Sequence, residues 1–251
     1  MLDAGHYGYR NQSPVVPEYW ESRRMWVLCE YLAEELRKFG FEVLKTRNDI
    51  DKFVDVYDRG KMSKGCDLFI SLHSNAVGDK GKEATDRVDV YAAFDNQNES
   101  HTLAKALSKA ISDVMKVSDG GVKTRKGDKG EYYGVMSGAR KVGCPLYYIV
   151  EHSFHTNRYA ASWLLEDENL KRLAVVEAAV IAAYYGIAPI YPQGDVNMNG
   201  YLDADDIILI KRAYFGMASL SEEQKKLADF DENGELDASD YILAKRKFFG
   251  M

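Results

Sequence analysis

The sequence predicts an α/β domain, with a mostly parallel, twisted sheet and helices on both faces, followed by a small all-α module. Strand-like and helix-like segments alternate through most of the chain, as they do where crossover helices join the strands of a sheet. An acidic loop then occurs twice, at 195–206 and 229–240, each time before an apolar helical stretch. We therefore expect two domains, at 1–188 and 195–251, with a short linker at 189–194.

The large domain begins with the tripeptide Leu2-Asp-Ala, which predicts the end of a first strand whose beginning lies upstream, together with an export signal. Residues 18–39 place apolar side chains at helical spacing, and Gly40 ends this helix. Short apolar or β-branched runs predict strands, and a polar segment with helical spacing predicts a second helix. These segments are a strand at 41–46, a helix at 54–62 and a strand at 67–73.

The second half of this domain continues the alternation. Residues 118–134 are rich in Gly, Lys and Asp without any periodicity, which predicts a long loop. A long apolar helix is expected at 163–185, closed by Gly186. The remaining predicted elements are a strand at 88–94, a helix at 103–115 and a strand at 146–150.

Metal-binding and acid–base side chains follow these strands. His6 follows the first strand, His73 ends the strand DLFISLH, and Glu151 follows LYYIV. Active residues of such sheets lie at the carboxyl ends of strands. Two histidines, one carboxylate and a water make an open catalytic zinc site, and a further carboxylate can act as general base. Glu18 and Glu21 share one face of the first helix, so spacing does not choose between them, and hydrogen-bonded structural histidines remain the alternative.

The duplicated loops have the ligand pattern of calcium sites. Calcium takes six to eight oxygen ligands, and loop positions 1, 3, 5, 7, 9 and 12 supply them around a glycine at position 6. The segment before the first loop is rich in proline and cannot form an entering helix, so each repeat is a loop followed by a helix. The expected ligands are Asp195, Asn197, Asn199, Tyr201 (through its carbonyl), Asp203 and Asp206, then Asp229, Asp231, Asn233, Glu235 (through its carbonyl), Asp237 and Asp240.

Composition excludes several classes of function. The net charge is −6, of which −5 lies in residues 195–251, so nothing favours nucleic-acid binding. No apolar run reaches 18 residues, which excludes a helical membrane span. The three cysteines lack metal-ligand spacing. Cys66 and Cys144 adjoin apolar runs and are expected in the core, and the chemical state of Cys29, Cys66 and Cys144 is left open.

The large domain resembles the zinc-dependent N-acetylmuramoyl-L-alanine amidases of the amidase_3 family over about residues 1–186. The motifs that carry the resemblance are Asp3-Ala-Gly-His6, Glu21, Thr46-Arg47, Arg59, Ile70-Ser-Leu-His-Ser-Asn-Ala76 and Val150-Glu-His-Ser-Phe-His-Thr-Asn157. The resemblance implies one zinc ion on His6, Glu21 and His73, and Glu151 as the catalytic glutamate. One departure is Tyr7-Gly8-Tyr9-Arg10, where the family usually has Gly-Gly-x-Asp.

The implied reaction is hydrolysis of the amide bond between N-acetylmuramic acid and L-alanine in peptidoglycan. His152, His155 and Asn157 are candidate substrate contacts, with turn capping as the alternative, and His101 is expected to be merely exposed. Tyr7, Tyr9, Tyr132 and Tyr133 are candidates for lining a glycan-peptide groove, with core and rim positions as the alternative. A wall-binding component without activity and a zinc peptidase acting on stem peptides are the competing functions.

Residues 195–251 resemble a type I dockerin, which implies two structural calcium ions and a cohesin partner on a scaffolding protein. The family's partner-binding positions correspond to Ala204, Asp205, Lys211, Arg212, Ala238, Ser239, Lys245 and Arg246. The chain is thus expected to be a monomer that works outside the cell or at its surface, attached to a scaffold.

Overall fold

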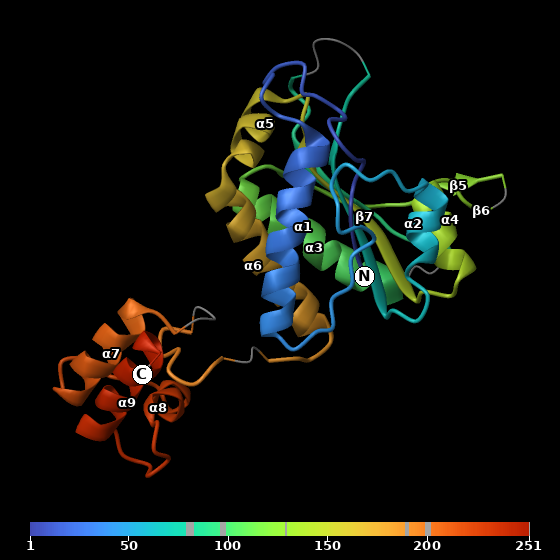
Figure 1. Cartoon of the computed structure of the whole chain (residues 1–251). Coiled ribbons are helices and arrows are strands. Elements are labelled where there is room, and N and C mark those ends of the chain that lie inside the picture. The colour runs from blue at the N-terminus through green and yellow to red at the C-terminus, as the bar shows by residue number, and fades with distance from the viewer. Residues whose placement is uncertain (79–82, 96–98, 129, 189–190, 199–201, 251) are drawn as a thin grey trace. The chain divides into compact units, whose positions relative to one another are not determined.

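The computed structural model describes residues 1–78, 83–95, 99–128, 130–188, 191–198 and 202–250 (Figure 1). The chain forms two compact units, Met1–Ala188 and Pro189–Met251. The first unit is an α/β sheet structure and the second is helical. Among the described residues, no helix combines the length and the apolar character needed to cross a membrane.

A five-stranded sheet forms the centre of the first unit. Its strands lie in the order β1 (Leu2–Ala4), β2 (Leu68–Asn75), β7 (Leu146–Phe154), β3 (Arg87–Tyr91) and β4 (Ser118–Lys123). Three of the four strand pairs are parallel, and only β3 and β7 run antiparallel. The predicted mostly parallel sheet is therefore confirmed.

Helices cover both faces of this sheet, as the sequence predicted. Figure 1 shows α1 (Glu21–Lys38), α3 (Glu99–Met115) and α6 (Asp167–Tyr184) on one side of the sheet. The shorter helices α2 (Val56–Lys61) and α4 (Gly134–Lys141) lie on the other side. The larger core packs apolar residues of α1, α3 and α6 against strand residues such as Leu72 and Val150. Burial of this apolar surface is the main stabilising term for the unit.

The face covered by α2 and α4 is apolar only in part. Phe69, Tyr147 and Ile149 of this face pack against α4. Toward the carboxyl ends of β1, β2 and β7 the same face carries polar side chains. They share this face with the apolar ones because every second residue of a strand points to the same side. Strand register aligns Asp3 with Ser71, and His73 with Glu151. The functional side chains lie on this polar part of the sheet.

The predicted strand at 41–46 and the predicted helix at 163–185 differ from the structure. Residues 41–46 form no strand of the sheet; the segment runs beside β1 and makes a single parallel bridge, between Leu2 and Lys45. At this bridge the Leu2 backbone N–H donates to the Leu44 carbonyl, and the Leu2 carbonyl accepts from the Thr46 N–H. The predicted helix at 163–185 is two helices, α5 (Arg158–Leu165) and α6, because the backbone of Glu166 is extended with φ −82° and ψ 122°.

The predicted loop at 118–134 is wrong. It contains β4, a short hairpin of β5 (Lys126–Gly127) and β6 (Gly130–Glu131), and the first residue of α4. Close packing between strands requires glycine at Gly120, because a Cβ at this position would lie 2.1 Å from Oδ1 of Asp89 on the neighbouring strand. Glycine therefore allows β4 to approach β3, and its lack of a side chain hid the strand from pattern analysis.

The second unit contains one helix after each acidic loop and one between the repeats. These are α7 (Ala204–Tyr214), α8 (Glu222–Ala228) and α9 (Ala238–Phe249). Val196, Ile210, Ala228 and Ala244 are buried at its centre. The predicted all-α module is confirmed, and α8 is an addition to the expected two loop–helix repeats.

Candidate metal and catalytic site

Three elements bring His6, Glu21 and His73 together. His6 lies two residues after β1, His73 lies near the end of β2, and Glu21 is the first residue of α1. His6 has a left-handed backbone, with φ 58°, which turns the chain directly after the strand. Such a conformation is unfavourable for a residue with a side chain, and strained positions of this kind cluster at functional sites.

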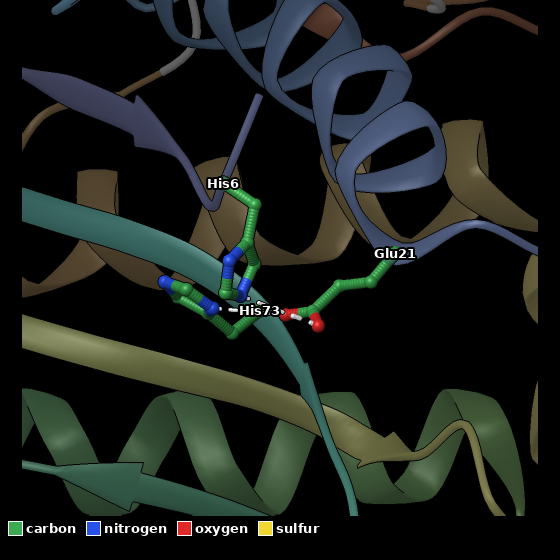
Figure 2. Close-up of side chains that lie close together, drawn as sticks. All are labelled: His6, Glu21 and His73. Atoms are coloured by element: carbon green, nitrogen blue, oxygen red, sulfur yellow. Dashed lines mark hydrogen bonds and ion pairs between the residues drawn. The ribbon is translucent and has the colours of Figure 1, made fainter. Parts of the chain in front are cut away.

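The three side chains point toward one another (Figure 2). Nδ1 of His73 lies 2.9 Å from Oε1 of Glu21, and Nε2 of His6 lies 3.4 Å from Oε2 of the same carboxylate. One atom from each of the three residues lies within 4.8 Å of the other two. The imidazole rings meet edge to face at a centroid distance of 5.0 Å.

Glu21 is held in its charged form. Burial by itself would raise the pKa of the Glu21 carboxyl, but its contacts with His6 and His73 outweigh burial and place the pKa below its usual range. Two further donors contact this carboxylate: the Asn11 amide at 2.7 Å and the Ser74 backbone N–H at 3.1 Å. Glu18, the rival candidate, is exposed and lies outside this group.

Gly5 allows this arrangement. A Cβ at Gly5 would lie 2.5 Å from Cε1 and 2.6 Å from Nδ1 of His73. The His73 ring therefore lies directly against the backbone between β1 and His6, in space that any other residue would fill.

Glu151 lies beside His73 on the neighbouring strand β7. This strand continues past Glu151 to Phe154, so the residue lies inside the strand and not at its end. Burial, then the charges of Glu21 and Asp89, raise the pKa of the Glu151 carboxyl well above its ordinary value. Its Oε2 is buried with no hydrogen-bond partner, which leaves one carboxylate oxygen available for a proton. A carboxyl group tuned in this way suits acid–base catalysis.

The donor set fits a zinc ion. Ligand bonds of about 2.0–2.1 Å place the corners of a zinc tetrahedron about 3.3 Å apart. The 2.9 and 3.4 Å separations between Glu21 and the two histidines agree with that spacing. Two imidazoles and one carboxylate leave the fourth position open, as catalytic zinc sites do.

The second acidic loop of the other unit also gathers carboxylates. Oxygen atoms of Asp229, Asp231 and Asp240 lie within 4.8 Å of one another. Asp240 is fully buried, and its Oδ1 accepts hydrogen bonds from the Phe230 and Asp231 backbone amides while Oδ2 accepts one from Asp237. Three close carboxylates repel one another unless a cation lies between them, and calcium, which prefers oxygen ligands, fits this set.

The first acidic loop is described in part. Asp206 is fully buried, and its carboxylate accepts hydrogen bonds from the Asn197 and Asp203 backbone amides, as Asp240 does in the second loop. Asp195 is also fully buried. Asn199 and Tyr201 lie outside the described residues. In the second loop, Asn233 donates its backbone N–H to Asp229, and Glu235 donates its own to the Asn233 side chain.

Residues 1–183 match the sequence model of the N-acetylmuramoyl-L-alanine amidase family, Amidase_3. The chain belongs to this family. Residues 193–249 match the dockerin type I domain. The chain is thus an N-acetylmuramoyl-L-alanine amidase by class, with a dockerin type I domain after the amidase domain. A comparison with curated protein sequences gave no significant match.

Solved structures share the fold of the amidase domain. The structure is similar to Cwp6 from Clostridium difficile, with a TM-score of 0.65 and 26% identity, over 73% of this chain and 28% of that one. It is similar to the catalytic domain of CwlV from Bacillus (Paenibacillus) polymyxa var. colistinus, with a TM-score of 0.62 and 20% identity, over 74% and 97%. It is also similar to AmiC2 of Nostoc punctiforme, with a TM-score of 0.61 and 19% identity, over 74% and 95%.

The candidate substrate contacts of the amidase domain occupy structural positions. His152 is fully buried; its Nδ1 lies 3.0 Å from the His73 carbonyl and its Nε2 lies 3.0 Å from Glu177. Asn157 caps α5 by accepting a hydrogen bond from the Ala160 backbone N–H. His155 is buried, its Nδ1 lies 3.9 Å from Oε2 of Glu21, and burial lowers its pKa. Of the three, only His155 borders the candidate zinc site.

The candidate groove tyrosines of the amidase domain divide into two pairs. Tyr9 and Tyr132 are exposed, whereas Tyr7 and Tyr133 are half-buried. Tyr7 packs edge to face against Phe53, which is itself 63% exposed. His101 is half-buried, with Nε2 3.3 Å from the Ala93 carbonyl. All eight candidate partner-binding residues of the dockerin are exposed: Ala204, Asp205, Lys211, Arg212, Ala238, Ser239, Lys245 and Arg246.

Sequence reasoning missed Asp89, Gly5 and Asn11. Asp89 is a buried carboxylate that pairs in register with Glu151 across the antiparallel strands. A lone carboxylate in the apolar run Val-Asp-Val-Tyr was the available signal. Asn11 offered none, because its amide reaches Glu21 and His6 only through the folding of the loop that follows His6.

Proposed function

We propose that the amidase domain hydrolyses the amide bond between N-acetylmuramic acid and L-alanine in peptidoglycan, with one zinc ion on His6, Glu21 and His73. The observation that carries this proposal is the close approach of these three ligand groups, next to Glu151, in a chain of the amidase family. When bound, zinc supplies Lewis-acid activation of water and of the scissile carbonyl.

Carboxylates of the chain carry out the proton transfers of the proposed reaction and set the charge around them. Glu151 takes a proton from the attacking water and delivers it to the departing L-alanine nitrogen, so the carboxyl returns to its starting state after each turnover. Glu21 contributes a negative charge that its neighbours hold in the ionised form. Burial, together with the Glu21 and Asp89 charges, disfavours ionisation of Glu151, which makes it a stronger base once it is ionised.

Product analysis tests the reaction. Digestion of purified peptidoglycan by the zinc-loaded chain is expected to release peptides that begin with L-alanine and to leave free lactyl carboxylates on the muramic acid. Mass spectrometry measures both products. A cut between two amino acids would support a stem-peptide hydrolase instead, and no cleavage with zinc bound would support a wall-binding component.

The Asp89→Asn substitution is expected to move the acid limb of the pH–rate profile to lower pH. The base form of Glu151 is ionised, so activity falls as pH drops through its pKa. Removing the Asp89 charge, which Arg87 faces at 3.1 Å, takes away a repulsive neighbour and lowers that pKa. The profile of kcat/KM against pH measures the shift, and an unchanged or raised acid limb would contradict the role of Asp89. The Asp119→Asn variant, altered at a carboxylate on β4 that contacts Ser108, is the matched control.

We further propose that the dockerin domain holds two structural calcium ions and binds a cohesin domain of a scaffolding protein. This would keep the enzyme outside the cell or at its surface, as a monomer attached to the scaffold. The gathered carboxylates of the second loop and the exposure of the eight candidate partner residues support the proposal. Calorimetric titration with cohesin domains tests it, and binding that does not depend on calcium would count against it.

Calcium removal is expected to unfold the dockerin unit and leave the amidase unit folded. Asp195, Asp206 and Asp240 are fully buried, and their charges lose compensation without the ion. Each calcium site filled at 100 times its dissociation constant adds about 2.7 kcal/mol to the stability of the unit. Calorimetry of metal-free protein should show one transition, with a second recovered by calcium but not by zinc. Two transitions in the metal-free protein would show that the dockerin unit folds without calcium.

A further inference from the structure

We propose that Asp3 and Ser71 position His73 for metal binding by fixing which ring nitrogen carries the proton. Both belong to the family motifs, yet neither touches the cluster of His6, Glu21 and His73 as a ligand. The inference rests on the proposed zinc site and concerns the residues behind it.

The contacts form a continuous chain from the sheet interior to the ring of His73. Ser71 Oγ lies 2.6 Å from Oδ2 of Asp3 and 3.1 Å from Nε2 of His73. Asp3 and Ser71 are both fully buried. This series of hydrogen bonds reaches the ring at Nε2, whereas Glu21 faces Nδ1 at 2.9 Å.

The Asp3 carboxylate accepts hydrogen bonds from two side chains besides Ser71. Arg59 donates Nη1–H to Oδ2 at 2.8 Å and Thr46 donates its hydroxyl to Oδ1 at 2.6 Å. The ion pair with Arg59 is buried on both sides. A carboxylate that accepts from these groups has no proton to give, so Asp3 can only accept from Ser71.

The position of one proton then determines the next. The hydroxyl of Ser71 has a single hydrogen, which it donates to Asp3. Toward His73 it can therefore only accept, so Nε2 of the ring carries a hydrogen. A neutral imidazole protonated on Nε2 presents its lone pair on Nδ1, the atom that faces Glu21 and the candidate zinc position. Outer hydrogen bonds of this kind orient metal-binding histidines and raise their basicity.

The alternative is that Asp3 serves only the stability of the sheet through Arg59. The Thr46→Val variant separates the two roles. Thr46 donates to the same carboxylate at the same 2.6 Å as Ser71 does, but lies off the path to His73. Loss of either hydroxyl removes one hydrogen bond to Asp3, and only loss of Ser71 frees the His73 ring.

The test is the zinc affinity of the full chain, measured by competition with a chromogenic chelator. Ser71→Ala is expected to weaken zinc binding about 10- to 100-fold, and Thr46→Val by less than about threefold. Asp3→Asn is expected to act in the same direction as Ser71→Ala, because an amide N–H turned toward Ser71 reverses its hydroxyl. Melting of the metal-free proteins confirms that each variant folds. Equal affinities for Ser71→Ala and Thr46→Val would overturn the inference.

Nitrogen NMR of the zinc-loaded wild-type chain gives a test that does not depend on any variant. His73 is expected to show a protonated Nε2 and a metal-bound Nδ1. A protonated Nδ1 would overturn the inference even if zinc binds. Failure of the wild-type chain to bind zinc at all would instead overturn the proposed function, so the two failures are distinguishable.

Discussion

Replacement of Glu151 by glutamine is expected to reduce kcat on peptidoglycan by about 10²- to 10⁴-fold, the usual contribution of a positioned general acid–base group. Glutamine keeps the shape of the side chain but cannot accept the proton of the attacking water. Because the surroundings of Glu151 disfavour its ionised form, a neutral amide should fit at no cost in stability. Single-turnover rates of amide cleavage measure the loss.

The control for this prediction is Glu131→Gln. Glu131 is a second carboxyl of the same unit whose pKa is raised by burial, and one of its oxygens also lacks a partner. It contacts Tyr147 at 2.9 Å, on the part of the sheet packed against α4. This variant should keep full activity, and both variants should keep the zinc content and melting temperature of the wild type. Normal activity of Glu151→Gln would show that another group moves the proton.

The Gly5→Ala substitution is expected to reduce kcat/KM by about 10²-fold, because displacement of a catalytic group by about 1 Å has an effect of that size. The added methyl would lie 2.5 Å from the His73 ring and 2.7 Å from the Leu72 carbonyl, so the ring must move away from its present position. The backbone at Leu72 belongs to the sheet and cannot yield. Zinc content after dialysis and kcat/KM on peptidoglycan measure the two consequences.

Gly78→Ala is the matched control for Gly5→Ala. It makes the same chemical change at a position where a Cβ meets no atom within 4 Å. This variant should bind zinc and cleave peptidoglycan as the wild type does. If Gly5→Ala retains zinc and activity, then the space beside the His73 ring is not needed for the site.

The sequence by itself was enough for the fold class and for most elements of the large domain. Runs rich in apolar residues, such as DLFISLH and LYYIV, predicted β2 and β7, because a strand buried on both faces is largely apolar. It failed where local composition gave no such signal. Glycines concealed β4, and the continuous apolar pattern concealed the break between α5 and α6 at Glu166.

Sequence pattern determined the candidate ligands and the duplicated acidic loops, since both depend on residue types at fixed spacing. Only the tertiary structure decided which side chains meet. Glu21 and not Glu18 reaches the histidines because α1 begins at Glu21, and Asp89 faces Glu151 because β3 runs antiparallel to β7. His152 lies beside the His73 carbonyl because β7 pairs with β2. Proximity between distant segments follows from strand order and register, which long-range packing sets and no local pattern records.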